Sequence, residues 1–135
     1  MSLLAIDHVQ LAMPVGGEDK ARAFYEGLLG IPEVEKPDNL KARGGCWFAV
    51  GNVKIHLGVE EEFRPSRKAH PAFLVEELKS MMEQIRNAGH EVAAADIVGD
   101  YERFHAFDPF GNRIEFMQLS IMSRTEEDRQ MLAAT

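Results

Sequence analysis

The chain has 135 residues, of which 45% are hydrophobic and 27% charged, and 15 basic against 22 acidic side chains give a net charge of −7. This length corresponds to one domain or two small modules, and the composition excludes collagen-like, low-complexity and wholly disordered chains. The acidic excess disfavours binding to nucleic acid, which depends on clustered Lys and Arg. No run approaches the roughly 18 apolar residues of a membrane span. The start of the chain lacks a basic region and reaches Asp7 early, unlike a secretory signal.

The single cysteine, Cys46, cannot form a disulfide within the chain. We interpret it as a small hydrophobic core residue, and we expect a soluble, cytoplasmic protein.

The first half of the chain predicts a strand, a helix and three further strands. A strand at 5–13 precedes a helix around 21–28, whose apolar residues follow the i, i+3, i+4, i+7 pattern and which Gly30 ends. Extended segments follow at 33–35, 46–50 and 53–59, and Gly51-Asn52 predicts a tight turn between the last two.

The second half repeats this order about 60 residues later, after a polar segment at 60–68 that we interpret as a linker. A helix around 78–88 ends at Gly89, and Gly111-Asn112 marks the last turn. The predicted strands of this half are 69–75, 91–94, 103–108 and 113–120. Pro71 lacks a backbone N–H, so its strand should lie at a sheet edge or at the seam between modules.

We therefore predict an α+β fold of two βαβββ modules, at 1–59 and 69–122, with a charged tail at 123–135. The two modules would form a cupped, barrel-like mixed sheet with the helices outside.

Strand alternation places four candidate metal ligands on the sheet faces that point away from the helices. These ligands are His8, His56, His70 and Glu115. Three imidazoles and one carboxylate suit Zn²⁺, Ni²⁺, Fe²⁺ or Co²⁺ and leave the ion able to act as a Lewis acid. A hydrogen-bonded structural role is the alternative for each residue, and His56 as a fourth ligand would crowd an open site.

Other polar residues have less specific interpretations. We expect His90 to be structural, and His105 to line a pocket or support the structure. The basic cluster of Arg64, Arg67 and Lys68 is either a clamp for a substrate carboxylate or phosphate, or a solvated linker that offsets nearby acidic residues. The residues that could line the cup are Tyr101, Arg103 and either Trp47 or Phe48, which alternate along their strand.

Three segments, 6–11, 69–73 and 108–116, read IDHVQL, AHPAF and DPFGNRIEF. They resemble the vicinal oxygen chelate superfamily, which contains glyoxalase I, fosfomycin-resistance enzymes, extradiol dioxygenases, methylmalonyl-CoA epimerase and metal-free bleomycin-binding proteins. The resemblance extends from 4 to 119. It implies a cupped sheet around a divalent metal, with His8, His70 and Glu115 as ligands. His56 occupies a position where glyoxalase I usually carries a carboxylate.

By this resemblance we expect a glyoxalase-like lyase or isomerase that acts on a small oxygenated metabolite. A divalent metal (Zn, Ni, Fe(II), Mn or Co) would stabilise an enediolate or oxyanion, and Glu115 or His56 would move the proton. One alternative is an extradiol ring-cleaving dioxygenase with Fe²⁺ or Mn²⁺, although such enzymes usually have four modules. Another is a non-catalytic, drug-sequestering binding protein, which the four donors disfavour. Members are commonly dimers, so a homodimer is expected.

Overall fold

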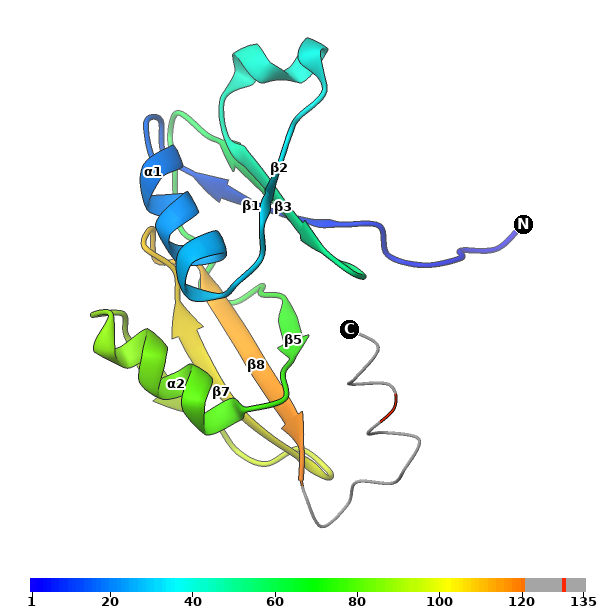
Figure 1. The fold of residues 1–135 in the computed structure, drawn as a ribbon, viewed down its shortest axis with the longest axis vertical. Helices are drawn as coiled ribbons and strands as arrows, with labels where there is room; N and C mark the ends of the chain where they lie inside the picture. Colours follow the sequence, from blue (N-terminus) through cyan, green and yellow to red (C-terminus); the bar gives the residue numbers. More distant parts are fainter. Residues whose placement is uncertain (121–129, 131–135) are drawn as a thin grey trace. The chain divides into compact units, whose positions relative to one another are not determined.

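The computed structural model describes residues 1–120 and residue 130. The chain forms two compact units, Met1–Pro65 and a second unit that begins at Ser66, and each unit holds its own sheet (Figure 1). The boundary falls within the segment 60–68. The predicted tail lies almost entirely outside the described residues.

The first unit has a four-stranded mixed sheet in the order β1-β4-β3-β2. β1 runs parallel to β4, and the other neighbours are antiparallel. Its elements are β1 (Val9–Met13), α1 (Glu18–Ala21), the π-helix η1 (Arg22–Leu28), β2 (Glu33–Val34), the 3-10 helix η2 (Asp38–Arg43), β3 (Cys46–Val50) and β4 (Val53–Val59).

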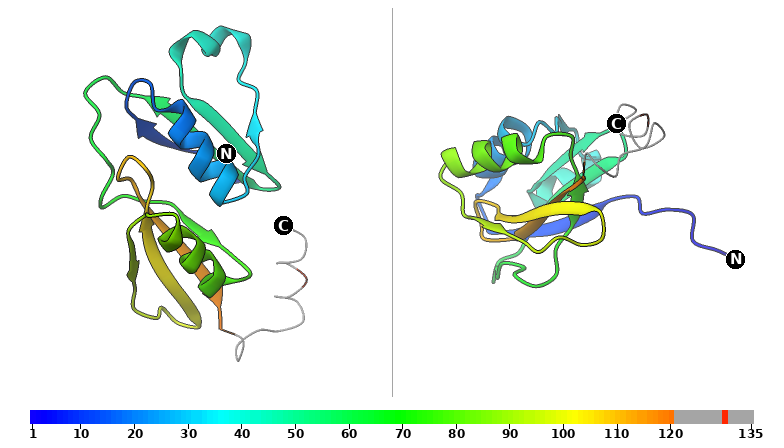
Figure 2. Two further views of the ribbon diagram at one scale, coloured as in Figure 1. Left: turned by 60° about the vertical axis from the view of Figure 1, so that its left-hand side comes forward. Right: turned by 90° about the horizontal axis from the view of Figure 1, so that it is seen from below.

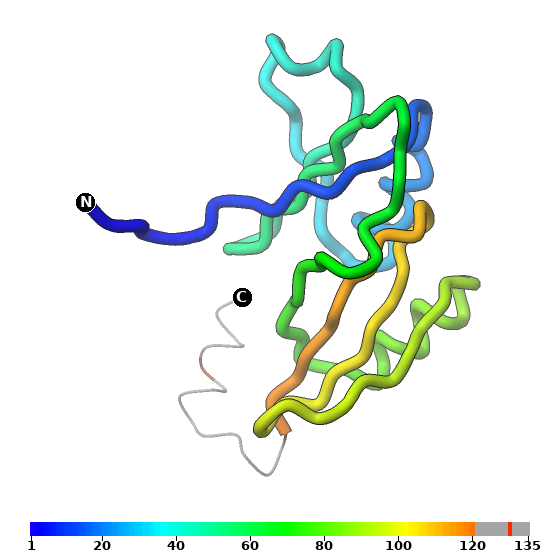
Figure 3. Tube along the Cα trace, turned by 180° about the vertical axis from the view of Figure 1, so that it is seen from behind, coloured from blue at the N-terminus to red at the C-terminus, as the bar shows by residue number. Residues whose placement is uncertain are grey.

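The second unit repeats this topology in the order β5-β8-β7-β6, with β5 parallel to β8. Its elements are β5 (Ala72–Leu74), α2 (Leu78–Asn87), β6 (Val92–Ala94), β7 (Tyr101–Phe107) and β8 (Arg113–Leu119). The helix α2 lies over one face of this sheet (Figure 2), and β5, β8 and β7 run side by side (Figure 3). The predicted α+β fold of two βαβββ modules is confirmed.

The structure differs from the predicted elements mainly at strand ends. β1 and β5 begin at Val9 and Ala72, so His8 and His70 lie in the extended segments just before the strands. β5 is an edge strand, as Pro71 predicted. η2 carries no strong apolar periodicity and was not predicted.

Glycine follows the two predicted helices, the continuous α1–η1 segment and α2, as expected. Gly30 and Gly89 have φ values of 75° and 92°, in the left-handed region that a side chain disfavours. Each helix directs a buried apolar stripe at its sheet. The fully buried residues of the two helices are Ala21, Phe24, Tyr25 and Ile85. Tyr25, for example, packs against Phe48 of β3, with ring centroids 5.5 Å apart. No described helix is long and apolar enough to cross a membrane.

Cys46 is buried in the core of the first unit, 1% exposed, as its interpretation as a hydrophobic core residue predicted. Burial raises the pKa of its thiol to about 11. At pH 8 the thiolate, which is the reactive form, should be about 100-fold scarcer than for a thiol with the ordinary pKa of 9.0. We expect iodoacetamide to label the folded protein far more slowly than the urea-unfolded chain, as measured by mass spectrometry. Equal labelling rates would contradict this burial.

Candidate functional site

The β7–β8 hairpin places His105 opposite Glu115. The turn between the strands pairs Phe107 with Arg113, and two residues further along each strand this register brings His105 beside Glu115. Alternate residues of the same strands, such as Phe104 and Phe116, stack against each other on the helix side. The hairpin therefore presents polar side chains on the sheet face that points away from α2.

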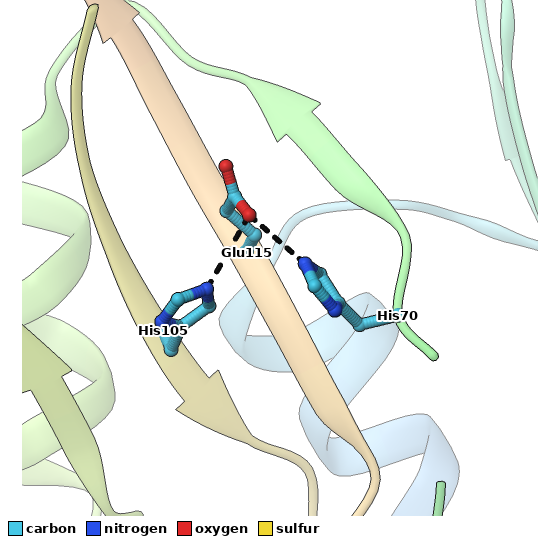
Figure 4. A group of neighbouring side chains, drawn as sticks. All are labelled: His70, His105 and Glu115. Atoms are coloured by element: carbon cyan, nitrogen blue, oxygen red, sulfur yellow. Dashed lines mark hydrogen bonds and ion pairs between the residues drawn. The ribbon is translucent and has the colours of Figure 1, made fainter. Parts of the chain in front are cut away.

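His70 reaches the same carboxylate from the segment before β5. The Glu115 amide donates to the carbonyl of Pro71 at 3.0 Å, which fixes this segment beside β8. Both imidazoles then point at the Glu115 carboxylate (Figure 4). Nε2 of His70 lies 2.9 Å from Oε1 of Glu115, and Nε2 of His105 lies 3.3 Å from the same oxygen. We call His70, His105 and Glu115 the triad.

The donor chemistry and spacing of the triad fit a divalent transition metal. Two imidazole nitrogens and one carboxylate oxygen lie within 4.8 Å of one another. Around a tetrahedral Zn²⁺, bond lengths of about 2.1 Å place neighbouring donor atoms about 3.4 Å apart. In the tautomer that a metal on Nε2 would require, Nδ1–H of His70 can donate to the carbonyl oxygen of Lys68, 2.8 Å away, and hold the ring in this orientation. Small side-chain shifts would let the triad surround an ion.

Two arginines flank the triad on the same sheet face. Nη1 of Arg103 lies 3.4 Å from Oε1 of Glu115, and its Nε donates to the carbonyl of Asp96 at 2.6 Å. Nη2 of Arg113 lies 3.2 Å from Nδ1 and 3.0 Å from Nε2 of His105. An arginine always donates, so His105 offers Arg113 the lone pair of a neutral ring.

Electrostatics favour the forms of His105 and Glu115 that metal binding requires. Burial and then the charge of Arg113 lower the pKa of His105, so its imidazole is neutral at pH 7. Burial acts to raise the pKa of Glu115, but hydrogen bonding from His70 and the charge of Arg103 outweigh it, and the pKa falls below its usual value. Glu115 is therefore an anion at neutral pH.

The first unit carries the counterpart of this arrangement. Its register aligns Gln10, His56 and Trp47 in a row, just as Ala72, Glu115 and His105 align in the second unit. His56 lies between two rings, with centroids 4.0 Å from His8 and 3.8 Å from Trp47. Burial, followed by the charge of His8, lowers the pKa of His56.

The four predicted ligands form two separate contacts in the structure. His8 stacks on His56, and His70 contacts Glu115. The pairs belong to different units, and the four-ligand set stays a prediction.

His105 is the donor that the sequence interpretation assigned to pocket lining or structure. The signal was present in the sequence, because the turn at Gly111-Asn112 and strand pairing together place His105 directly across from Glu115.

The predicted substrate-binding residues are spread more widely. Arg103 lies beside the triad, and Tyr101 begins the same strand, half-buried. The guanidinium of Arg67 lies 5.1 Å from the ring centre of Phe107, while Arg64 is exposed. Of these residues, only Arg103 directly contacts a triad side chain in the described part of the chain.

Comparison with known proteins agrees with the two-module fold. The model of the Glyoxalase/Bleomycin resistance protein/Dioxygenase superfamily matches residues 5–116. A solved structure from Bacillus anthracis, assigned to the glyoxalase family, is 48% identical, with a TM-score of 0.84 over 89% of this chain and 98% of that one. No match was found among curated proteins.

More distant structures share the fold. The genomically encoded fosfomycin resistance protein FosX from Listeria monocytogenes is 16% identical, with a TM-score of 0.71 over 95% of this chain and 99% of that one. A glyoxalase/dioxygenase from Nostoc punctiforme is 21% identical, with a TM-score of 0.66 over 88% of this chain and 97% of that one.

Proposed function

Because the chain belongs to the Glyoxalase/Bleomycin resistance protein/Dioxygenase superfamily, we propose that it is a divalent-metal-dependent lyase or isomerase of the glyoxalase type, acting on a small oxygenated metabolite. The observation that carries this proposal is the convergence of His70 and His105 on Oε1 of Glu115. Two neutral nitrogens and one carboxylate leave much of a 2+ charge uncompensated. A bound ion would supply Lewis-acid polarisation of substrate oxygens.

The Glu115 carboxylate has the geometry for two roles. The contacts from His70, His105 and Arg103 all converge on Oε1. The other oxygen, Oε2, points away from both imidazoles (Figure 4). We assign Oε1 to the contacts that position His70, His105 and Arg103. We assign Oε2 to accepting a proton from a carbon next to a substrate carbonyl. His56 is the second proposed base, because its lowered pKa keeps it neutral and able to accept a proton.

The third metal donor distinguishes two versions of this proposal. His105 is the donor beside His70 and Glu115 in the structure. His8 is the repeat counterpart of His70 and belongs to the ligand set implied by the sequence. Metal titration of the His105→Ala and His8→Ala variants separates them. The variant that lacks a true ligand should bind metal at least about tenfold more weakly.

The proposal is tested by metal analysis followed by an exchange assay. Untagged protein should contain stoichiometric divalent metal by mass spectrometry. It should also catalyse uptake of solvent deuterium into α-hydroxycarbonyl compounds, as read by NMR, and chelation should stop the exchange. Absence of stoichiometric metal would support a sequestering protein instead. Bound metal without exchange on a broad panel of such compounds would contradict lyase or isomerase chemistry.

A ring-cleaving dioxygenase is the second candidate, because two histidines and one carboxylate also form the donor set of non-haem Fe(II) oxygenases. Oxygen uptake with catechols by the Fe²⁺-loaded protein would favour this reading. We further propose that the protein is a cytoplasmic homodimer. Light scattering of the full chain measures the mass of the assembly and so tests the dimer.

A further inference from the structure

The polar face of the β7–β8 hairpin carries more positive than negative charge. Its outward-facing residues alternate along the two strands: Arg103, His105 and Phe107 on β7, and Arg113, Glu115 and Met117 on β8. Two guanidiniums therefore accompany a single carboxylate on this face. Binding of a divalent ion by the triad would increase this imbalance by two further charges.

The two guanidiniums extend toward the central row of this face, which is the pair His105 and Glu115. The backbone of Arg103 lies opposite Met117, and that of Arg113 opposite Phe107, at the two ends of this face. These positions are about 13 Å apart along the strands. Their side chains nevertheless contact the central row, Arg103 at Glu115 and Arg113 at His105. An anion above this row would be within reach of both.

Arg113 in particular lacks a matching negative charge. Its side chain is half-buried against the ring nitrogens of His105, and its Nη1 reaches the carbonyl of Arg67 at 3.5 Å. Among residues 1–120 and 130, no carboxylate oxygen lies within 4.0 Å of its guanidinium. The nearby carboxylate of Asp108 is buried and accepts hydrogen bonds from Phe110 and Asn112 in the turn. A guanidinium so placed matches a carboxylate or phosphate in both charge and hydrogen-bonding geometry.

We propose that Arg103 and Arg113 form an anion subsite, which binds a carboxylate or phosphate group of a small molecule beside the triad. The subsite itself requires no metal. Its role in selecting an anionic substrate rests on the proposed function. Anion binding would also relieve the repulsion between the arginines and a cation held by the triad, so metal and anion should each strengthen the binding of the other.

The test uses chelator-treated full-length protein, titrated with inorganic phosphate and with malonate, and followed by NMR. We expect saturable binding of one or both anions, weakened at least fivefold in Arg113→Gln and in Arg103→Gln. Arg86→Gln, which removes the same charge from an exposed position on α2, is the matched control and should bind like the original chain. The anion that binds with the higher affinity, phosphate or malonate, shows whether the subsite prefers a phosphate or a carboxylate.

Metal titration of the same samples separates this subsite from the proposed function. Arg103→Gln should bind Zn²⁺ several-fold more tightly while binding anions more weakly, and such opposite changes cannot come from misfolding. Arg113→Lys keeps the charge and should retain part of the anion affinity even if Arg113→Gln does not fold. Metal binding without anion binding, or equal losses in Arg86→Gln, would overturn the subsite alone. Anion binding without metal binding would support the subsite and overturn the proposed function.

Discussion

Replacing Glu115 with glutamine is expected to abolish stoichiometric metal binding. The substitution keeps the shape of the side chain but removes the negative charge on which His70 and His105 converge. A neutral amide oxygen is a much weaker ligand, and even loss of a supporting partner outside the ligand set weakens metal sites by about 10–100-fold. We therefore expect the affinity for Zn²⁺ or Co²⁺ to fall by more than about 100-fold in calorimetric titration.

The matched control is Glu102→Gln. Glu102 lies on the same hairpin, opposite Gln118, but its side chain is exposed on the other face of the sheet. The Glu102→Gln variant loses the same charge as Glu115→Gln and should bind metal like the original chain. A Glu115→Gln variant that keeps its metal would remove Glu115 from the ligand set and, with it, the proposed chemistry.

The order of elements was predictable from the sequence because it depends on local signals. Apolar residues at helical spacing, and glycines at Gly30 and Gly89, give the two helices and their ends. Alternation along the strands also assigned Glu115 to the face away from α2. These features need only neighbouring residues, and the repetition of one pattern in both halves reinforced each of them.

The composition of the triad depended on strand register, which a residue-by-residue interpretation does not supply. Considered alone, His105 is an ordinary strand residue, and it becomes a candidate ligand only when its partner across the hairpin is known to be Glu115. The same applies to Trp47, whose stacking on His56 follows from their pairing between β3 and β4. The contact of Arg113 with His105 is still less local, because it depends on side-chain conformation.

A buried amide lies in the turn before β8, where the register of the hairpin is set. Asn112 is 0% exposed, and its Oδ1 accepts a hydrogen bond from the amide of Ser66 at 2.9 Å. Its Nδ2 donates to Oδ2 of Asp108 at 3.0 Å. The next residue, Arg113, donates from its amide to the carbonyl of Ser66 at 2.8 Å. The amide therefore ties the hairpin to the segment that leads into His70.

Replacing Asn112 with alanine should destabilise the fold by about 3–5 kcal/mol. The variant leaves the Ser66 amide and one oxygen of the buried Asp108 carboxylate without these hydrogen bonds, and each loss costs about 1–3 kcal/mol or more where a charge is involved. Urea unfolding of the metal-free protein measures the change. Asn52, the exposed counterpart in the first module, provides the control. Asn52→Ala should change stability by less than about 0.5 kcal/mol. A similarly small effect for Asn112→Ala would mean that the hairpin keeps its register without this amide, and that the position of His105 opposite Glu115 has another cause.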